Sequence, residues 1–164
     1  MDRARVLVAG LGNVFLGDDA FGVLVAQRLQ ARAQPAGVRV VDFGIRSFDL
    51  ALALERCDAA ILVDATARGG APGTLYVLEP AAGTAGEALP SLHTTTPDEV
   101  LRRLAPGARP RTLRIVGCEP ASLGDPDGDE PAGLSARVQA AVGEAVVMVE
   151  ALVHELLRET PAGA

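Results

Sequence analysis

Acidic side chains follow three short apolar segments of this 164-residue sequence, and these acids are the groups best suited to chemistry. The segment 6–22, VLVAGLGNVFLGDDAFG, breaks at glycines and then carries the adjacent acids Asp18 and Asp19. Asp42 follows a second apolar run, and Asp64 directly follows a third, AAILV. A glycine-rich turn after a strand often binds a phosphate, but two carboxylates in that turn would repel one. The acids therefore indicate either a bound cation or acid–base chemistry.

A histidine on a long loop completes a possible metal-binding set. His93 lies in the irregular segment 80–96, whereas the other histidine, His154, lies late in the predicted terminal helix. Two carboxylates and one imidazole suit a borderline divalent metal such as nickel or zinc, and they leave coordination positions open. A carboxylate pair also suits acid–base work, and spacing alone does not decide between these uses. Structural explanations remain as well: a turn aspartate for Asp64, a helix N-terminal acid for Asp19 and a solvated loop histidine for His93.

The composition favours a globular protein and excludes several classes of function. Hydrophobic residues make up 49% of the chain, and the net charge of −6 gives no support to a nucleic-acid partner. All 15 basic residues are arginines, so no P-loop lysine is present. Cys57 and Cys118 form no CxxC pair and are expected to be small buried residues. Without a signal peptide or an apolar run of about 18 residues, we expect a cytoplasmic protein with no membrane partner. We also expect a monomer, which no sequence feature decides.

Apolar runs and helical stripes alternate through most of the chain, which predicts an α/β fold. The strand over 74–78 follows its predecessor after too short a gap for a crossover helix, so it should pair antiparallel or lie at an edge. We therefore expect a single domain over 1–159, a mostly parallel five-stranded sheet with helices on both faces, and a flexible tail over 160–164. The predicted strands are 6–9, 38–42, 59–63, 74–78 and 112–118, and the predicted helices are 18–32, 50–56 (capped by Ser47), 97–104 and 135–158.

The carboxyl ends of parallel strands form the usual ligand-binding edge of such a sheet. The loop with Asn13 and the two acids, the ends of the strands at Asp42 and Asp64, and the long loop with His93 should meet there. A dinucleotide site is one alternative, because GLGNVFLG contains G-x-G and Asp42 could imitate a ribose-binding acid. The third glycine comes two residues late, however, and the acids would repel a pyrophosphate.

Six segments in order resemble one known family. GLGNVFLGDDAFG resembles the G-x-G-N-x-x-x-x-D-[DE]-x-x-G signature of the [NiFe]-hydrogenase maturation endopeptidases. VVDFG, ILVDA, APGTLYVLEP, SLHTTTPDEVL and VGCEPASLGD resemble that family's later strand, histidine-loop and G-x-x-P segments. The resemblance covers roughly residues 5 to 155. It implies a single-domain α/β fold, a phosphorylase/hydrolase-like sandwich, and an endopeptidase that removes a C-terminal extension from the hydrogenase large-subunit precursor after nickel insertion.

The resemblance also implies roles for particular residues. The family's metal-contacting and catalytic positions fall on Asp19, Asp64 and His93, and the nickel they contact would belong to the precursor, with no nucleotide involved. Asp42 and Gly44 would help to bind the peptide. The turn that presents the acids would be shaped by Gly10, Gly12 and Asn13. A maturation chaperone that recognises the nickel site without cutting would use the same residues, so it remains an alternative.

Three positions depart from the family pattern. Ala20 stands where glycine is frequent, and Asp19 stands where many members have glutamate, which shortens the reach of the carboxylate. Phe43 replaces the first glycine of a D-G-G segment, and we expect it to influence which precursor is accepted. None of these changes removes a ligand type.

Overall fold

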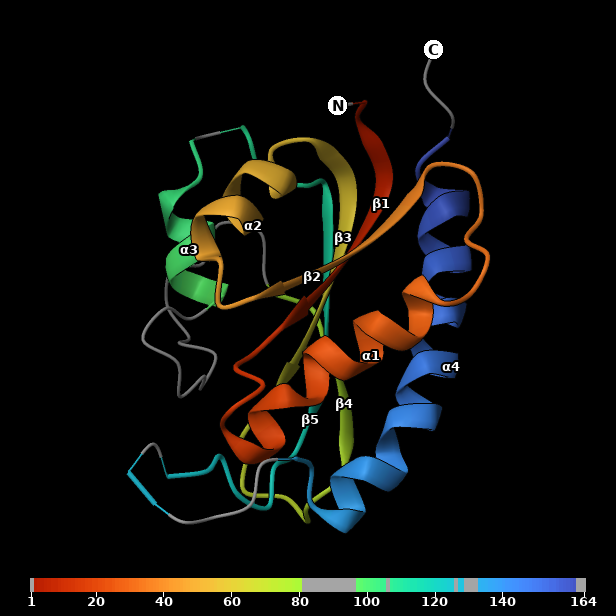
Figure 1. Ribbon diagram of the computed structural model, residues 1–164. Helices are drawn as coiled ribbons and strands as arrows, with labels where there is room; N and C mark the ends of the chain where they lie inside the picture. Colours follow the sequence, from red (N-terminus) through yellow and green to blue (C-terminus); the bar gives the residue numbers. More distant parts are fainter. Residues whose placement is uncertain (1, 81–96, 106, 126, 129–132, 162–164) are drawn as a thin grey trace.

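The strands and helices of the computed structural model are described over residues 2–80, 97–105, 107–125, 127–128 and 133–161 (Figure 1). The strands are β1 (Ala4–Leu11), β2 (Val38–Gly44), β3 (Cys57–Ala65), β4 (Leu75–Leu78) and β5 (Thr112–Cys118). The helices are the 3-10 helix η1 (Gly17–Ala20), followed by α1 (Phe21–Gln30), α2 (Ser47–Leu54), α3 (Pro97–Arg103) and α4 (Ala136–Glu159). Their order confirms the α/β fold predicted from the sequence.

The described strands form one five-stranded sheet in the order β2-β1-β3-β5-β4. β2, β1, β3 and β5 are parallel, and β4 pairs antiparallel with β5 at the edge of the sheet. The prediction for the strand over 74–78 is therefore confirmed. The carboxyl ends of the four parallel strands meet at one edge, and ligands of such sheets bind at that edge.

The two faces of the sheet are covered by different helices. Alternate side chains of β1 point to opposite faces, and both sets are buried. Val6 and Val8 pack in a core with α1 and α4, whereas Leu7 and Ala9 pack in a core with α2 and α3. Figure 1 shows these helix pairs on opposite sides of the sheet. A central parallel strand is apolar along its length because it is buried on both faces, and this confirms the predicted helices on both faces.

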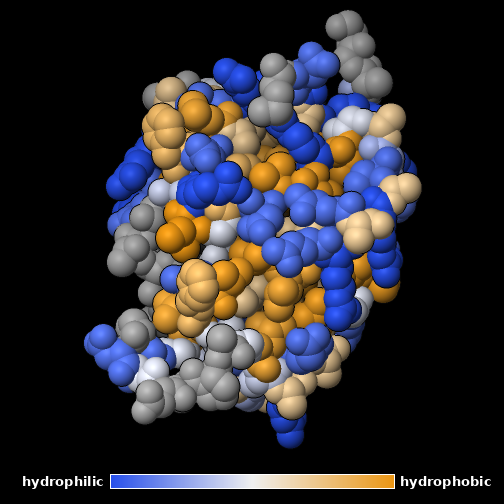
Figure 2. All heavy atoms as spheres, in the orientation of Figure 1, coloured by the Kyte–Doolittle hydropathy of each residue, from blue (hydrophilic) through white to orange (hydrophobic). Residues whose placement is uncertain are grey.

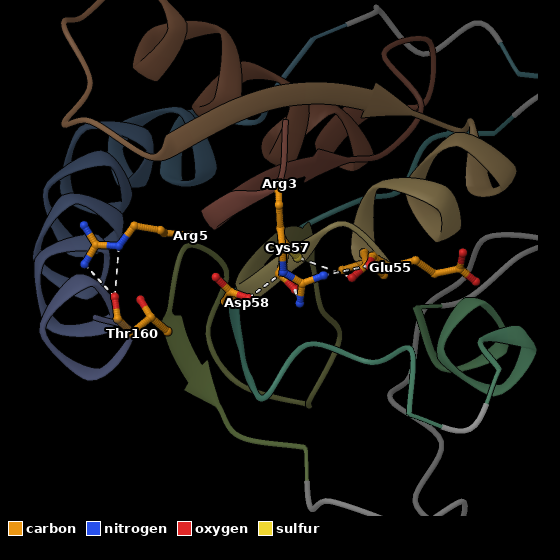
Figure 3. A network of polar contacts seen from close by, with 7 residues as sticks. Arg3, Arg5, Glu55, Cys57, Asp58 and Thr160 are labelled. Carbon is orange, nitrogen blue, oxygen red and sulfur yellow. Dashed lines mark hydrogen bonds and ion pairs between the residues drawn. The ribbon is translucent and has the colours of Figure 1, made fainter. Parts of the chain in front are cut away.

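The edge at the amino ends of the strands is held by two arginines of β1 and the segment before it (Figure 3). Arg3 forms an ion pair of 2.7 Å with Asp58, and the Nε of Arg5 donates to the Thr160 carbonyl at 2.9 Å. Thr160 is the first residue of the predicted tail, yet it is buried and its hydroxyl donates to the Leu156 carbonyl at 2.7 Å. The chain is therefore anchored through Thr160, and residues 162–164 lie outside the described part.

Two predicted helix starts differ from the observed ones. The helix predicted over 18–32 is divided into η1 and α1, because Gly17 has a left-handed φ of 53° and long-range hydrogen bonds hold Asp18. Ser47 is the first helical residue rather than the cap, since Arg46 occupies the capping position and its carbonyl accepts from the Leu50 N–H. None of the helices in the described ranges is long and apolar enough to cross a membrane.

Candidate active site

Three of the acids singled out in the sequence are buried at the carboxyl edge of the sheet. Asp18 and Asp19 are 1% exposed and Asp64 is 2% exposed. Asp18 and Asp19 lie in η1, which contacts β3, and Asp64 is the penultimate residue of β3. Carboxylates are rarely buried unless hydrogen bonds or cations compensate for the lost hydration. The site therefore depends on what each carboxylate contacts.

Asp18 fastens two distant segments to η1. Its carboxylate accepts hydrogen bonds from the N–H groups of Ala121 at 2.8 Å and Ser122 at 3.1 Å. It also accepts from the Ser135 N–H at 2.7 Å and the Ser135 hydroxyl at 2.9 Å. These bonds join the loop after β5 and the residue before α4 to the start of α1. Asp18 therefore has a structural role in joining these segments.

Asp19 holds the glycine-rich turn after β1. Its Oδ2 accepts from the Asn13 N–H at 2.8 Å, and the Asn13 side-chain oxygen accepts from the Phe15 N–H at 2.9 Å. Gly12 has a φ of 135°, and a Cβ at this position would lie 1.8 Å from the Asp19 carbonyl oxygen. A larger residue at position 12 would push the turn away from Asp19. Gly12 and Asn13 are therefore packed directly against the residue they were predicted to present.

Two further glycines bring α1 close to the sheet. A Cβ on Gly10 would lie 2.4 Å from the Gly22 carbonyl oxygen, and a Cβ on Gly22 would lie 2.0 Å from the Val63 carbonyl oxygen. The first turn of α1 therefore touches the β3 backbone one residue before Asp64. This close approach brings the acids of η1 and β3 to the same end of the sheet.

Asp42 and Gly44, at the end of β2, have different surroundings. The Asp42 carboxylate accepts from the Gln27 side chain of α1 at 3.2 Å, and the backbone carbonyl of Asp42 accepts from the Arg46 guanidinium. Gly44 has a φ of 56°, and its carbonyl accepts from the Gly12 N–H at 3.0 Å. Gly44 also lines a narrow cleft of about 30 Å³ with seven other residues, which are Leu11, Ile45, Arg46, Ser47, Leu50, Asp64 and Val100. Gly44 and Asp64 therefore share a concave surface, while Asp42 is oriented toward α1.

His93, the third predicted ligand, lies outside the described residues, four positions before the start of α3. In the described part of the chain, no three His, Cys, Asp or Glu side chains are grouped so that they could hold a metal ion. The described residues thus supply the two aspartates of the predicted set and leave its histidine as a prediction from the sequence.

Glu119 is a buried acid at the same edge that the sequence analysis did not select. It directly follows β5 and accepts from the Arg68 N–H at 2.8 Å, the Gly69 N–H at 3.2 Å and the Tyr76 hydroxyl at 2.9 Å. Burial raises its pKa, but these hydrogen bonds outweigh burial and hold the pKa below its usual value. An acid directly after an apolar strand was the signal that singled out Asp64, and VGCE carries the same signal. Glu119 fixes the loop that follows Asp64.

The cysteines and Phe43 are part of the core. Burial raises the pKa of Cys57 and of Cys118 to about 12, so neither is a thiolate at neutral pH. This leaves no cysteine nucleophile in the chain. Phe43 is 4% exposed and packs in the core formed with α2 and α3. The Phe43 side chain is therefore part of the core, and its expected influence on which precursor is accepted stays a prediction.

Comparison with known proteins identifies the family. The sequence profile described as hydrogenase maturation protease matches residues 23–152. The chain belongs to the hydrogenase maturation protease family. It is 34% identical over 146 residues to the hydrogenase expression/formation protein HupD of Rhodobacter capsulatus, covering 87% of this chain and 70% of that protein. It is 33% identical over 162 residues to the hydrogenase 2 maturation protease of Escherichia coli, covering 92% of both chains.

Solved structures of the hydrogenase maturation proteases share the fold. The hydrogenase maturating endopeptidase HybD from Escherichia coli has a TM-score of 0.73 and 29% identity, over 92% of this chain and 93% of that one. A hydrogenase 2 maturation peptidase from a Thaumarchaeota archaeon has a TM-score of 0.70 and 28% identity, over 92% and 98%. This protein is therefore a peptidase, and the resemblance noted in its sequence is confirmed.

Proposed function

We propose that this peptidase removes the C-terminal extension of a [NiFe]-hydrogenase large-subunit precursor after nickel has been inserted, and that it recognises the nickel with Asp19, Asp64 and His93. The observation that carries the proposal is the burial of Asp19 and Asp64 at one edge of the sheet, in a chain of the hydrogenase maturation protease family. Buried carboxylates at one edge of the sheet form an acidic site to which a cation can bind. A nickel ion carried by the substrate is that cation in this proposal.

The position of α3 supports the assignment of His93. Val100 of α3 lines the cleft that contains Asp64, and α3 begins four residues after His93. Four residues span at most about 14 Å when extended, so His93 lies within that distance of the start of α3. This short separation keeps the imidazole near the end of the sheet where the cleft lies. A histidine and two aspartates leave positions on the ion for ligands from the precursor.

The chemistry follows from a metal held near the scissile bond. Nickel with open positions polarises a carbonyl oxygen or lowers the pKa of a bound water. Asp19 and Asp64 would hold that ion through one oxygen each, and the second oxygen of either carboxylate could accept a proton from the attacking water. Gly44 lines the cleft and is proposed to bind the peptide there. Asp42, whose carboxylate faces Gln27 of α1, is proposed to bind the same peptide farther from the cleft.

A dinucleotide-binding function is disfavoured by the same acids. The residues before α1, where a pyrophosphate would bind, are the buried Asp18 and Asp19. A chaperone that binds the loaded precursor without cutting it does not fit membership of this peptidase family, and the cleavage assay below distinguishes the two functions.

Variants of the proposed ligands test the assignment. Asp64→Asn and His93→Ala should each reduce cleavage of a nickel-loaded precursor at least about 100-fold, because each removes a metal ligand or its charge. Cleavage would be followed on gels as the appearance of the shortened large subunit. His154→Ala is the matched control, since His154 is exposed on α4, and it should cleave normally. Normal cleavage by His93→Ala would contradict the assignment.

A further inference from the structure

Several large apolar side chains are exposed beside the acidic edge. Phe15 is 81% exposed, Phe48 74%, Ile45 70% and Val14 43%. We call these four residues the apolar rim. Single exposed apolar residues are common, but a group of large ones at one place is typical of a binding surface. Figure 2 shows hydrophobic surface beside the ends of β1 and β2 and over the start of α1.

The residues of the apolar rim lie on the loop after β1 and on the segment that runs from the end of β2 into α2, and these two segments touch each other. Val14 and Phe15 follow β1, whereas Ile45 and Phe48 follow β2. The two segments are joined where the Gly12 N–H donates to the Gly44 carbonyl at 3.0 Å. Every residue of the rim is within four positions of one of these glycines. Two segments more than 25 residues apart in the sequence therefore contribute to one surface.

α2 is apolar on both sides. Leu50 and Leu54 are buried against the sheet. Phe48 and Leu52, which are four residues apart and so lie on one side of the helix, are exposed. A surface helix normally presents polar residues to solvent, and a helix that is apolar all round is normally covered. The outer side of α2 thus has the composition of a contact surface.

Hydrogen bonds hold the apolar rim in position. The turn that carries Phe15 is closed by the Asn13 side chain, and the backbone N–H of the same asparagine donates to Asp19. On the second segment, Arg46 lies 5.8 Å from the centre of the Phe43 ring and donates to the Phe43 carbonyl at 3.2 Å. A surface fixed in this way loses less conformational entropy when a partner binds.

The apolar rim is continuous with the cleft. Ile45 belongs to the rim and also lines the cleft that contains Asp64. We propose that the apolar rim binds a nonpolar segment of the hydrogenase large-subunit precursor next to the bond that is cut. The proposal rests on the function proposed above, and its occupant follows from the activity, because a peptidase must hold a polypeptide beside its reacting groups. The apolar rim would bind the precursor polypeptide, and the aspartates would bind its nickel.

Binding and kinetics of rim variants test this proposal. A Phe15→Ser/Phe48→Ser double variant should raise both the Kd for a purified nickel-loaded precursor and the KM at least about tenfold, since each lost side chain removes buried apolar area. The kcat should stay within about twofold, because the acids are unchanged. Biolayer interferometry gives the Kd, and initial rates at varied precursor concentration give KM and kcat. Thermal unfolding verifies that the variant is folded.

The chain supplies a matched control. Val14→Ser removes an apolar side chain from the rim, while Val147→Ser removes one of the same kind from the outer side of α4, where it is 62% exposed. Val14→Ser should weaken binding and Val147→Ser should not. An unchanged Kd and KM for the double variant, with normal cleavage, would contradict the proposed role of the apolar rim in precursor binding. The proposed function would be unaffected by that result. Binding that depends on the rim without any cleavage by the unaltered protein would instead overturn the proposed function.

Discussion

The two adjacent aspartates of η1 should respond differently to the same substitution. Asp18 accepts four hydrogen bonds from residues at least 103 positions away, and Asp19 accepts a hydrogen bond of 2.8 Å from the Asn13 N–H, six positions away. Asp18→Asn replaces an acceptor of four bonds by an amide with donors of its own, and it should lower the free energy of unfolding by about 3 kcal/mol. Asp19→Asn keeps an oxygen that accepts from the Asn13 N–H, so it should lower the free energy of unfolding less than Asp18→Asn does.

Urea unfolding followed by circular dichroism measures both differences. The exposed Asp127, changed to Asn, provides the control and should leave stability unchanged. Equal losses from Asp18→Asn and Asp19→Asn would contradict the division between a structural and a functional aspartate.

Glu119 gives the protein a stability contribution that depends on pH. The folded state holds the pKa of Glu119 below its usual 4.5, so the ionised carboxylate stabilises the folded protein above that pH. The contribution is lost as the pH falls through the lowered pKa. Glu119→Gln should therefore lower the free energy of unfolding by about 2 kcal/mol at neutral pH, with a smaller difference near pH 3.

Chemical unfolding of both proteins across this pH range gives the measurement. Tyr76→Phe removes one of the hydrogen bonds to Glu119 and should show a smaller loss with the same trend. A difference between Glu119→Gln and the unaltered protein that grows in acid would contradict the sign of the shift.

At the scale of elements, the seating of α1 against the sheet is the feature that positions the site. Gly22→Ala would place a Cβ 2.0 Å from the Val63 carbonyl oxygen, so α1 would have to move away from β3. We expect a loss of about 3 kcal/mol in the free energy of unfolding and a fall in peptidase activity. The same substitution at Gly143 of α4 meets its nearest atom, in Arg28, only at 4.0 Å. Gly143→Ala should therefore stabilise the protein by up to about 1 kcal/mol.

Differential scanning calorimetry of the two variants makes this comparison directly. Equal effects of Gly22→Ala and Gly143→Ala would mean that the contact between α1 and β3 does not constrain the helix.

The strands could be predicted from the sequence because their signals are local. The strand predicted over 112–118 coincides with β5, because its apolar residues form one short run and its polar residues, Thr112 and Arg114, lie in its amino-terminal half. The division between η1 and α1 could not be predicted, because it depends on Asp18 bonding to Ser122 and Ser135, which are brought near only by the fold. The start of α2 could not be predicted from a serine cap, because Ser47 is already helical and the backbone carbonyl of Arg46 makes the first helical bond.

In the whole molecule, the two ends of the sheet have different roles, because one is fixed by structural contacts and the other carries the candidate site. The amino ends of the strands are fastened by Arg3 and Arg5, which join β1 to β3 and to the end of α4. The carboxyl ends gather buried acids, a cleft and the apolar rim. The gathering of Asp19 and Asp64 could be anticipated because parallel strands align their carboxyl ends. The rim could not, since the apolar residues of α2 do not reveal in sequence which side faces the core.

Cleavage should depend on nickel in the precursor, and intact-mass spectrometry of the precursor measures that dependence. A cognate large-subunit precursor, with and without nickel, would be incubated with this protein and its mass recorded. We expect the mass of a C-terminal peptide to be lost from the nickel-loaded precursor alone. Equal cleavage of the precursor with and without nickel would contradict the proposed role of Asp19, Asp64 and His93. An intact precursor in a stable complex, whatever its loading, would identify a recognition module and contradict the proposed processing.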